Sequence, residues 1–294
     1  MVSDLTVLEG VLEGTNLHIF TFVKTDQPGI QFAHNWDNVG LRLTESGGVR
    51  IDNVHVPWSD ALGWDITTKA PAPEILGIPF ATLLLPTIQL VFSNFYLGIA
   101  LGALNTATKY TRTSTRAWPY GGDNKESATD EWYTLERYGD FRAHLDAAEA
   151  LTDRAGEAIA AVYSDAAASS SSDGHESTGN INGHTNGHTS TNASSPKAAW
   201  SATAAGRATI TAQRRGEVAT RVATAKVVTT DTGLRVTSGI FELLGSRATS
   251  KKAGFDRFWR DVRTHSLHDP VAYKRREVGR WALLSEIPEP TWYT

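Results

Sequence analysis

Hydrophobic and polar positions follow a two-residue repeat over the first seventy residues, a pattern typical of β-strands. Residues 17–24 (LHIFTFVK) are rich in β-branched and aromatic side chains, and the turn signal QPG follows them at 27–29. Residues 49–51 and 54–56 each alternate valine or isoleucine with polar neighbours, one residue out of phase with each other. This pattern predicts two short strands separated by a bulge or tight turn, ending at Pro57.

After the proline-rich connector 70–73, apolar positions recur every three to four residues, which is typical of helices. We therefore expect an α+β chain, with a partial antiparallel β-domain in residues 1–72 and a helical domain in residues 73–294. The segments expected to be helical are 75–116 with a break near Pro86, 130–163, 198–230, a segment containing 238–244 that ends at Gly245, 255–263 and 270–285.

Residues 166–197 separate the second and third expected helices and contain almost no bulky apolar side chain. Such a composition cannot form a packed core and predicts a disordered insert. The segment carries three histidines that are an alternative metal-binding set: His175, His184 and His188. A flexible polar insert is the commoner explanation of such a segment.

The run 75–108 contains no charged residue and is long enough to span a bilayer. Two prolines and several polar residues interrupt it, among them Gln89 and Asn94. The preferred interpretation is a helix buried on every side within a helical assembly, and a membrane span is the alternative.

The composition narrows the chemistry that the chain can perform. Because the sequence has no cysteine, disulfide scaffolds, thiolate nucleophiles, Cys-ligated zinc and iron–sulfur clusters are excluded. The formal charge of -4 and the sequence pI near 6.1 argue against a nucleic-acid-binding surface. The first residues lack the pattern of a secretory signal, so a cytoplasmic protein is expected.

No P-loop, dinucleotide-binding fingerprint, nucleophile elbow or HExxH motif occurs in the sequence. The main candidate for chemistry is the cluster His265, His268 and Asp269, which precedes Pro270 at an expected helix-turn-helix corner. An imidazole exchanges protons near neutral pH, which favours a general acid or base role. Two alternatives stay open, namely a metal site and a cluster in which Asp269 only caps a helix.

Arg116 and Arg247 lie in turns with Gly, Ser or Thr neighbours, where a guanidinium group is suited to bind phosphate. Simple solvated charges are the alternative interpretation.

Four segments together resemble the acyl-CoA dehydrogenase-fold flavoproteins, in which an N-terminal helical domain, a middle β-domain and a C-terminal up-and-down four-helix bundle surround a flavin. These segments are 36–42 (WDNVGLR), 46–57 (SGGVRIDNVHVP), 97–104 (LGIALGAL) and 258–274 (FWRDVRTHSLHDPVAYK). The last of them is similar to the flavin-dependent monooxygenase branch, which includes dibenzothiophene-desulfurising enzymes. The resemblance implies that residues 1–72 are the remnant of the middle β-domain.

The resemblance implies reduced flavin mononucleotide (FMN), with flavin adenine dinucleotide (FAD) as alternative, and oxygenation of an apolar aromatic or heterocyclic substrate. His268, and less strongly His265, would lie near the flavin ring and stabilise or protonate the reacting oxygen. Arg247, and less strongly Arg116, would contact the cofactor phosphate, either in the same subunit or from a neighbouring one, and Trp36 would flank the flavin. A homotetramer and a flavin reductase as electron source are also implied, without a metal, nucleic acid or stable membrane insertion.

Compared with that family, the sequence has no counterpart of the N-terminal helical domain or of the first half of the β-domain. Three explanations stay open: a truncated gene model, a fragment of a longer protein, and a chain that has lost catalysis. The alternative functions are an acyl-CoA dehydrogenase, which removes a proton with a carboxylate base, and a non-catalytic subunit that only assembles.

Overall fold

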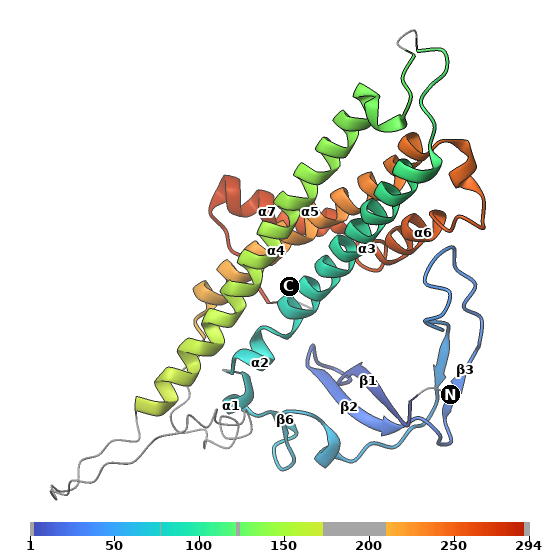
Figure 1. Cartoon of the computed structure of the whole chain (residues 1–294). Helices are drawn as coiled ribbons and strands as arrows, with labels where there is room; N and C mark the ends of the chain where they lie inside the picture. Colours follow the sequence, from blue (N-terminus) through green and yellow to red (C-terminus); the bar gives the residue numbers. More distant parts are fainter. Residues whose placement is uncertain (1–2, 77, 122–123, 173–209, 291–294) are drawn as a thin grey trace, which may run out of the picture.

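Three long helices form the main body of the protein, and three small sheets lie to one side of it (Figure 1). The computed structural model describes residues 3–76, 78–121, 124–172 and 210–290. Within this part, all strands precede residue 72 and all α-helices follow it. The fold is α+β, with small sheets and a predominantly helical second part, as predicted.

Each sheet has two antiparallel strands. The pairs are β1 (Leu5–Val11) with β2 (His18–Lys24), β3 (Ile30–Phe32) with β4 (Val49–Ile51), and β5 (Trp64–Asp65) with β6 (Ala70–Pro71). The predicted strand at 54–56 is absent from the described residues. Asn53 takes a left-handed conformation with a φ of 51°, so the expected tight turn forms but no second strand follows it.

The α-helices are α1 (Pro73–Leu76), α2 (Pro79–Thr82), α3 (Leu84–Ser114), α4 (Trp132–Ser172), α5 (Ala212–Leu244), α6 (Asp256–His265) and α7 (Val271–Leu284). Short 3-10 turns occupy Trp58–Asp60, Ala128–Asp130 and Ser246–Thr249.

The helix boundaries confirm the predicted break and correct two other predictions. The helical run breaks at Leu83, close to Pro86 as predicted, and continues as α3; Pro86 lies in the first turn of α3, where its missing N–H has no helical acceptor. The two helices expected within 198–244 are one helix, α5, which Gly245 ends as predicted. The insert does not begin at 166, because α4 continues to Ser172. The remainder of the predicted insert, with its three histidines, lies outside the described residues.

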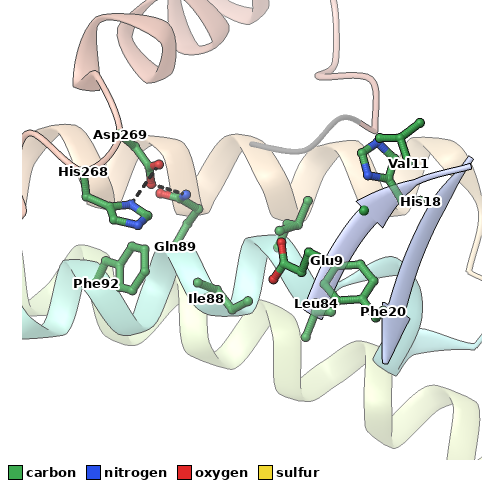
Figure 2. A pocket seen from close by; sticks show the side chains of 12 residues that line it. Glu9, Val11, His18, Phe20, Leu84, Ile88, Gln89, Phe92, His268 and Asp269 are labelled. Atoms are coloured by element: carbon green, nitrogen blue, oxygen red, sulfur yellow. Dashed lines mark hydrogen bonds and ion pairs between the residues drawn. The ribbon is translucent and has the colours of Figure 1, made fainter. Parts of the chain in front are cut away.

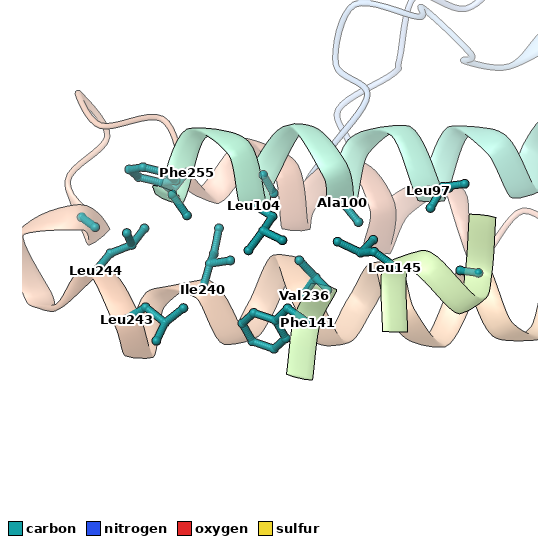
Figure 3. Packing of buried hydrophobic residues seen from close by; sticks show 14 residues of the cluster. Leu97, Ala100, Leu104, Phe141, Leu145, Val236, Ile240, Leu243, Leu244 and Phe255 are labelled. Carbon is teal, nitrogen blue, oxygen red and sulfur yellow. The ribbon is translucent and has the colours of Figure 1, made fainter. Parts of the chain in front are cut away.

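The core lies where α3, α4 and α5 meet (Figure 3). Leu104, Phe141 and Ile240, one from each helix, are at most 6% exposed. Burial of each such side chain stabilises the fold by roughly 1.5–3 kcal/mol. α3 contributes three fully buried small residues that let its neighbours approach closely: Ala100, Ala103 and Ala107.

Helix α3, which contains most of the charge-free run 75–108, has the length and composition of a membrane span, a test that the core helix of a soluble protein also passes. One of its faces belongs to the core just described. The opposite face is open in the single chain, since Val91 and Phe95 remain 45% and 47% exposed, so burial on every side within an assembly stays a prediction. Part of this exposed face lines a cavity next to α6.

The segment 38–41 attaches the β-part to α6. The amide N–H of Gly40 donates to Thr264 Oγ1 over 2.9 Å, and that of Leu41 donates to Asp261 Oδ1 over 2.8 Å. A Cβ on residue 40 would lie 2.1 Å from the carbonyl oxygen of Arg260, so only glycine permits this close approach. These contacts fix the loop that carries Trp36 against the helix that carries His265.

Candidate functional site

The predicted cluster of His265, His268 and Asp269 lies at the end of α6 and in the turn before α7. α6 is amphipathic as predicted, and Phe255 and Val262 anchor its apolar face with at most 2% exposure. The turn carries the two imidazoles to the exposed face of α3. The sequence pattern thus located the corner, and α3 supplies the surface against which it packs.

His265 is enclosed by aromatic side chains of α3. Its Nδ1 lies 2.9 Å from the hydroxyl of Tyr96, and the rings of Phe92 and Phe95 meet it edge-on at 4.6 and 5.6 Å between centroids. Burial, together with the positive charges of His268 and Lys226, lowers the pKa of His265 to about 4. His265 is therefore neutral at pH 7 and able to donate or accept one hydrogen bond at each nitrogen as its tautomer requires.

His268 stacks on His265, with ring centroids 5.7 Å apart and planes inclined by 13°. Its Nδ1 lies 3.1 Å from Asp269 Oδ1, while its side chain is 61% exposed. When Nδ1 carries the proton and donates it to this carboxylate, Nε2 is left as an acceptor on the accessible side of the ring.

Asp269 is the buried partner of this pair, with 6% exposure (Figure 2). Its Oδ2 accepts a hydrogen bond of 2.7 Å from Gln89 and lies 3.7 Å from the Lys226 ammonium. Burial alone would raise the pKa of Asp269, but the Gln89 hydrogen bond and the Lys226 charge outweigh it, so the pKa is lowered and the group is ionised. Pro270 occupies the N-cap position of α7, and the Asp269 side chain turns into this network instead of capping the helix.

Two cavities open on either side of His268. One, of about 600 Å³, lies between the β1–β2 hairpin and α3 and is lined mainly by apolar side chains, including Phe20, Leu84 and Ile88 (Figure 2). The other, of about 1040 Å³, lies between the 36–46 loop, α3 and α6. Both volumes are of the size that small molecules and cofactors occupy in proteins.

The structure brings three of the predicted site residues together, since Trp36, His265 and His268 all line the larger cavity. Trp36 Nε1 donates to the carbonyl oxygen of Leu41 over 2.7 Å, which fixes the indole at the edge of the cavity.

The predicted phosphate-binding arginines lie elsewhere in the same chain. Arg247 Nη2 donates to the carbonyl oxygen of Ser114 at the C-terminal end of α3, and Arg116 follows two residues later. Eighteen helical residues separate Ser114 from Tyr96, a distance of roughly 27 Å. One small cofactor molecule therefore cannot contact His265 and Arg247 of a single chain.

Sequence patterns did not reveal four residues of the site, Gln89, Phe92, Tyr96 and Lys226. The first three lie in the charge-free run, where the sequence pattern does not distinguish a residue that lines a site from one that packs in the helix core. Lys226 is 1% exposed, although lysine side chains are almost never fully buried unless they are paired. A lysine followed by two valines gives no sequence signal of such burial. Within the described residues no group of three or more His, Asp or Glu side chains is arranged to hold a metal ion.

The chain matches the family described as "Acyl-CoA dehydrogenase, C-terminal domain" over residues 90–179 and 188–272. It is 35% identical to the dibenzothiophene monooxygenase of Mycolicibacterium goodii over 98% of the chain and 59% of that protein. It is 33% identical to the probable FMNH2-dependent monooxygenase SfnC of Pseudomonas putida, over 92% of the chain and 56% of that protein.

Among solved structures, the complex of TdsC from Paenibacillus sp. A11-2 with FMN and indole superposes with a TM-score of 0.75 at 32% identity. That match covers 100% of this chain and 64% of the TdsC chain. The chain thus spans less than two thirds of the length of these relatives. Since the family match extends over more than half of the residues, the chain belongs to the acyl-CoA dehydrogenase C-terminal domain family.

Proposed function

We propose that the chain is the β-and-helical part of a flavin-dependent monooxygenase that uses reduced FMN and oxygen on an apolar aromatic or heterocyclic substrate. The observation that carries this proposal is the position of His268, which lines both cavities and has its Nδ1 tied to a buried carboxylate. One imidazole that can exchange a proton thus lines both cavities.

The larger cavity fits a flavin ring. Its walls combine aromatic and small apolar side chains, among them Trp36, Phe95 and Gly98, with the polar groups of Arg263 and Thr264 at its rim. A flat, amphipathic heterocycle needs such a slot, with hydrogen-bonding groups at the edge. Relatives described as FMNH2-dependent and as FMN-bound support FMN, and FAD is the alternative cofactor.

When bound, the reduced flavin supplies the two electrons that activate oxygen. The residues of the chain perform the remaining tasks. His268 holds its Nδ1 proton toward Asp269 and presents Nε2 to the cavities, where it takes up or returns a proton. Neutral His265 adds a second hydrogen-bonding imidazole without adding charge. The aromatic side chains of Phe92 and Phe95 pack against His265 and limit the access of water to it.

The smaller cavity is the proposed site of the organic substrate. Phe20, Ile88 and Phe92 give it apolar walls, and the carboxylate of Glu9 is its acidic lining residue. Dibenzothiophene and indole, which appear in the names of relatives, are flat aromatic heterocycles, and molecules of this kind suit an apolar cavity lining. An acyl-CoA dehydrogenase is the alternative function, in which a carboxylate facing the flavin would be the base.

The position of Arg247 supports assembly. Because Arg247 and Arg116 lie far from His265 in one chain, we propose that they reach the cofactor phosphate of a neighbouring copy in a homotetramer. In the same proposal residues 1–72 are a remnant of the middle β-domain, residues 73–294 form the helical domain, and α6 with α7 completes the up-and-down four-helix bundle. A flavin reductase would supply the electrons in the cytoplasm. A non-catalytic assembly subunit is the alternative for a chain without bound flavin.

The test is a visible absorption spectrum of the purified chain titrated with FMN and, separately, with FAD. Saturable binding of FMN, with the band shifts of a protein-bound flavin, is expected. Absence of binding to both would refute the proposal and favour the assembly subunit. With reduced FMN, oxygen and dibenzothiophene, His268→Ala should lose oxygenated product and release hydrogen peroxide, whereas the control His144→Ala, on the exposed face of α4, should retain the yield.

A further inference from the structure

Lys226, in the middle of α5, is a buried cation whose burial nothing described so far explains. Its side chain is 1% exposed, and its Nζ has no hydrogen-bond partner within the part of the chain that the structure describes. The ammonium lies 3.7 Å from Asp269 Oδ2 and above two aromatic rings, 4.8 Å from the centroid of Phe92 and 5.4 Å from that of Tyr96.

A buried ammonium is costly to desolvate, and one ion pair beyond hydrogen-bonding distance compensates only part of this cost. A methionine would fill the same volume without the cost. The carboxylate that Lys226 faces is the one that orients His268, since Oδ1 of Asp269 contacts His268 and Oδ2 faces Lys226 and Gln89. The two histidines therefore lie one carboxylate away from a fixed positive charge.

We propose that Lys226 is a positioning residue that acts through Asp269: its charge stabilises this buried carboxylate, so that the carboxylate holds Nδ1 of His268 and leaves Nε2 toward the cavities. The proposal rests on the proposed function only for the catalytic role of His268. The contacts of Asp269 with Lys226 and His268 are present in the chain whatever its function.

The reason is the charge balance of the cluster. Asp269 alone would stabilise an imidazolium beside it, because a buried carboxylate favours a neighbouring positive charge. With the Lys226 ammonium present, the carboxylate is already neutralised, and a second positive charge is disfavoured. Removing Lys226 therefore raises the pKa of the Asp269 carboxyl and the protonation midpoint of His265, and it leaves the carboxylate that holds His268 without its buried counter-charge.

The other charged and titratable groups around Lys226 come from α3 and α7. Tyr96 stays protonated, because burial and the Asp269 charge raise its pKa. Lys274 is paired with Glu277 over 3.0 Å, and its charge, together with burial, disfavours the Lys226 cation. Burial lowers the pKa of Lys226 to about 8, so this cation loses its proton within an accessible pH range.

The experiment uses the full chain without flavin or substrate, labelled with ¹⁵N-histidine, and records the imidazole nitrogen resonances between pH 4 and pH 10. In the unmodified chain, the resonances of His265 and His268 should show an inflection near pH 8, where Lys226 titrates.

Lys226→Met should abolish the inflection near pH 8 and raise the protonation midpoint of His265 by about one pH unit. Lys226→Arg should restore the unmodified behaviour at pH 7. Lys274→Met is the matched control, because it removes a similarly buried ammonium that is ion-paired with Glu277. Since the Lys274 charge disfavours the Lys226 cation, this variant should keep the inflection but move it above pH 8, and it should leave the midpoint of His265 unchanged.

Histidine resonances without an inflection near pH 8 in the unmodified chain would overturn the proposal, a result that requires no variant to fold. Equal effects of Lys226→Met and Lys274→Met on the histidine resonances would overturn it too. The loss of any buried ammonium, and not the position of Lys226 beside Asp269, would then explain the effects. A chain that shows the inflection but binds no flavin would refute the proposed function and leave the role of Lys226 intact.

Discussion

The low pKa of His265 predicts a measurable loss of stability in acid that a single substitution removes. The ordinary pKa of 6.5 applies to the unfolded chain, whereas burial lowers that of the folded chain to about 4. Between these two values the unfolded state binds a proton that the folded state does not. Stability is therefore complete above pH 6.5 and is lost as the pH falls through this window.

At pH 5 the difference between the folded and unfolded pKa values, taken without screening, lowers the free energy of unfolding by about 2 kcal/mol. Because His265 is only half-buried, solvent screening reduces the expected effect to about 1 kcal/mol. In His265→Gln this contribution is absent, so the variant should lose about 1 kcal/mol less of its free energy of unfolding than the unmodified chain between pH 7 and pH 5. Comparing the change with pH, and not the absolute stability, removes the effect of the lost Tyr96 contact.

The assay is urea unfolding followed by far-ultraviolet circular dichroism at both pH values. His144→Gln, on the exposed face of α4, is the control and should lose as much stability as the unmodified chain. If His265→Gln and the unmodified chain lose the same free energy of unfolding, the burial of a neutral imidazole at this position is refuted.

Three further predictions concern the elements around the site. Gly40→Ala places a Cβ 2.1 Å from the Arg260 carbonyl oxygen and should lower both the thermal midpoint and FMN affinity; Gly48→Ala, whose Cβ would meet only ordinary contacts, should change neither. Gly139→Ala, exposed within α4 with open space around its Cα, should raise the free energy of unfolding by about 0.5–1 kcal/mol in a urea titration, and a loss would contradict this account of α4. Asp269→Asn should cost about 3–5 kcal/mol by leaving Lys226 without a counter-charge; additive losses in the Lys226→Met double variant would argue against the pair.

The sequence by itself determined the local elements and the family resemblance. The alternation in residues 17–24 and 49–51 and the apolar stripe of α6 depend on side-chain periodicity, which is a property of neighbouring residues. The same local signals identified the corner with His265 and His268, because a helix end followed by Asp-Pro is read within a few positions.

The sequence did not state a residue's environment where that environment depends on distant segments. The charge-free run was expected to be buried on every side within an assembly, and in the single chain one face of α3 lines the larger cavity. Arg247 shares a motif with the family, but its position at the far end of α3 depends on how α3 and α5 align.

The tertiary structure alone decided the proton chemistry of the site. Gln89, Lys226 and Asp269 come from three segments separated by more than forty residues each, and only the packing of α3, α5 and the turn before α7 brings them within 4 Å of a common carboxylate. Periodicity states which face of a helix is apolar, but it does not state which partner covers that face. The charge state of a buried group depends on that partner, because desolvation and neighbouring charges, and not residue type, set its pKa.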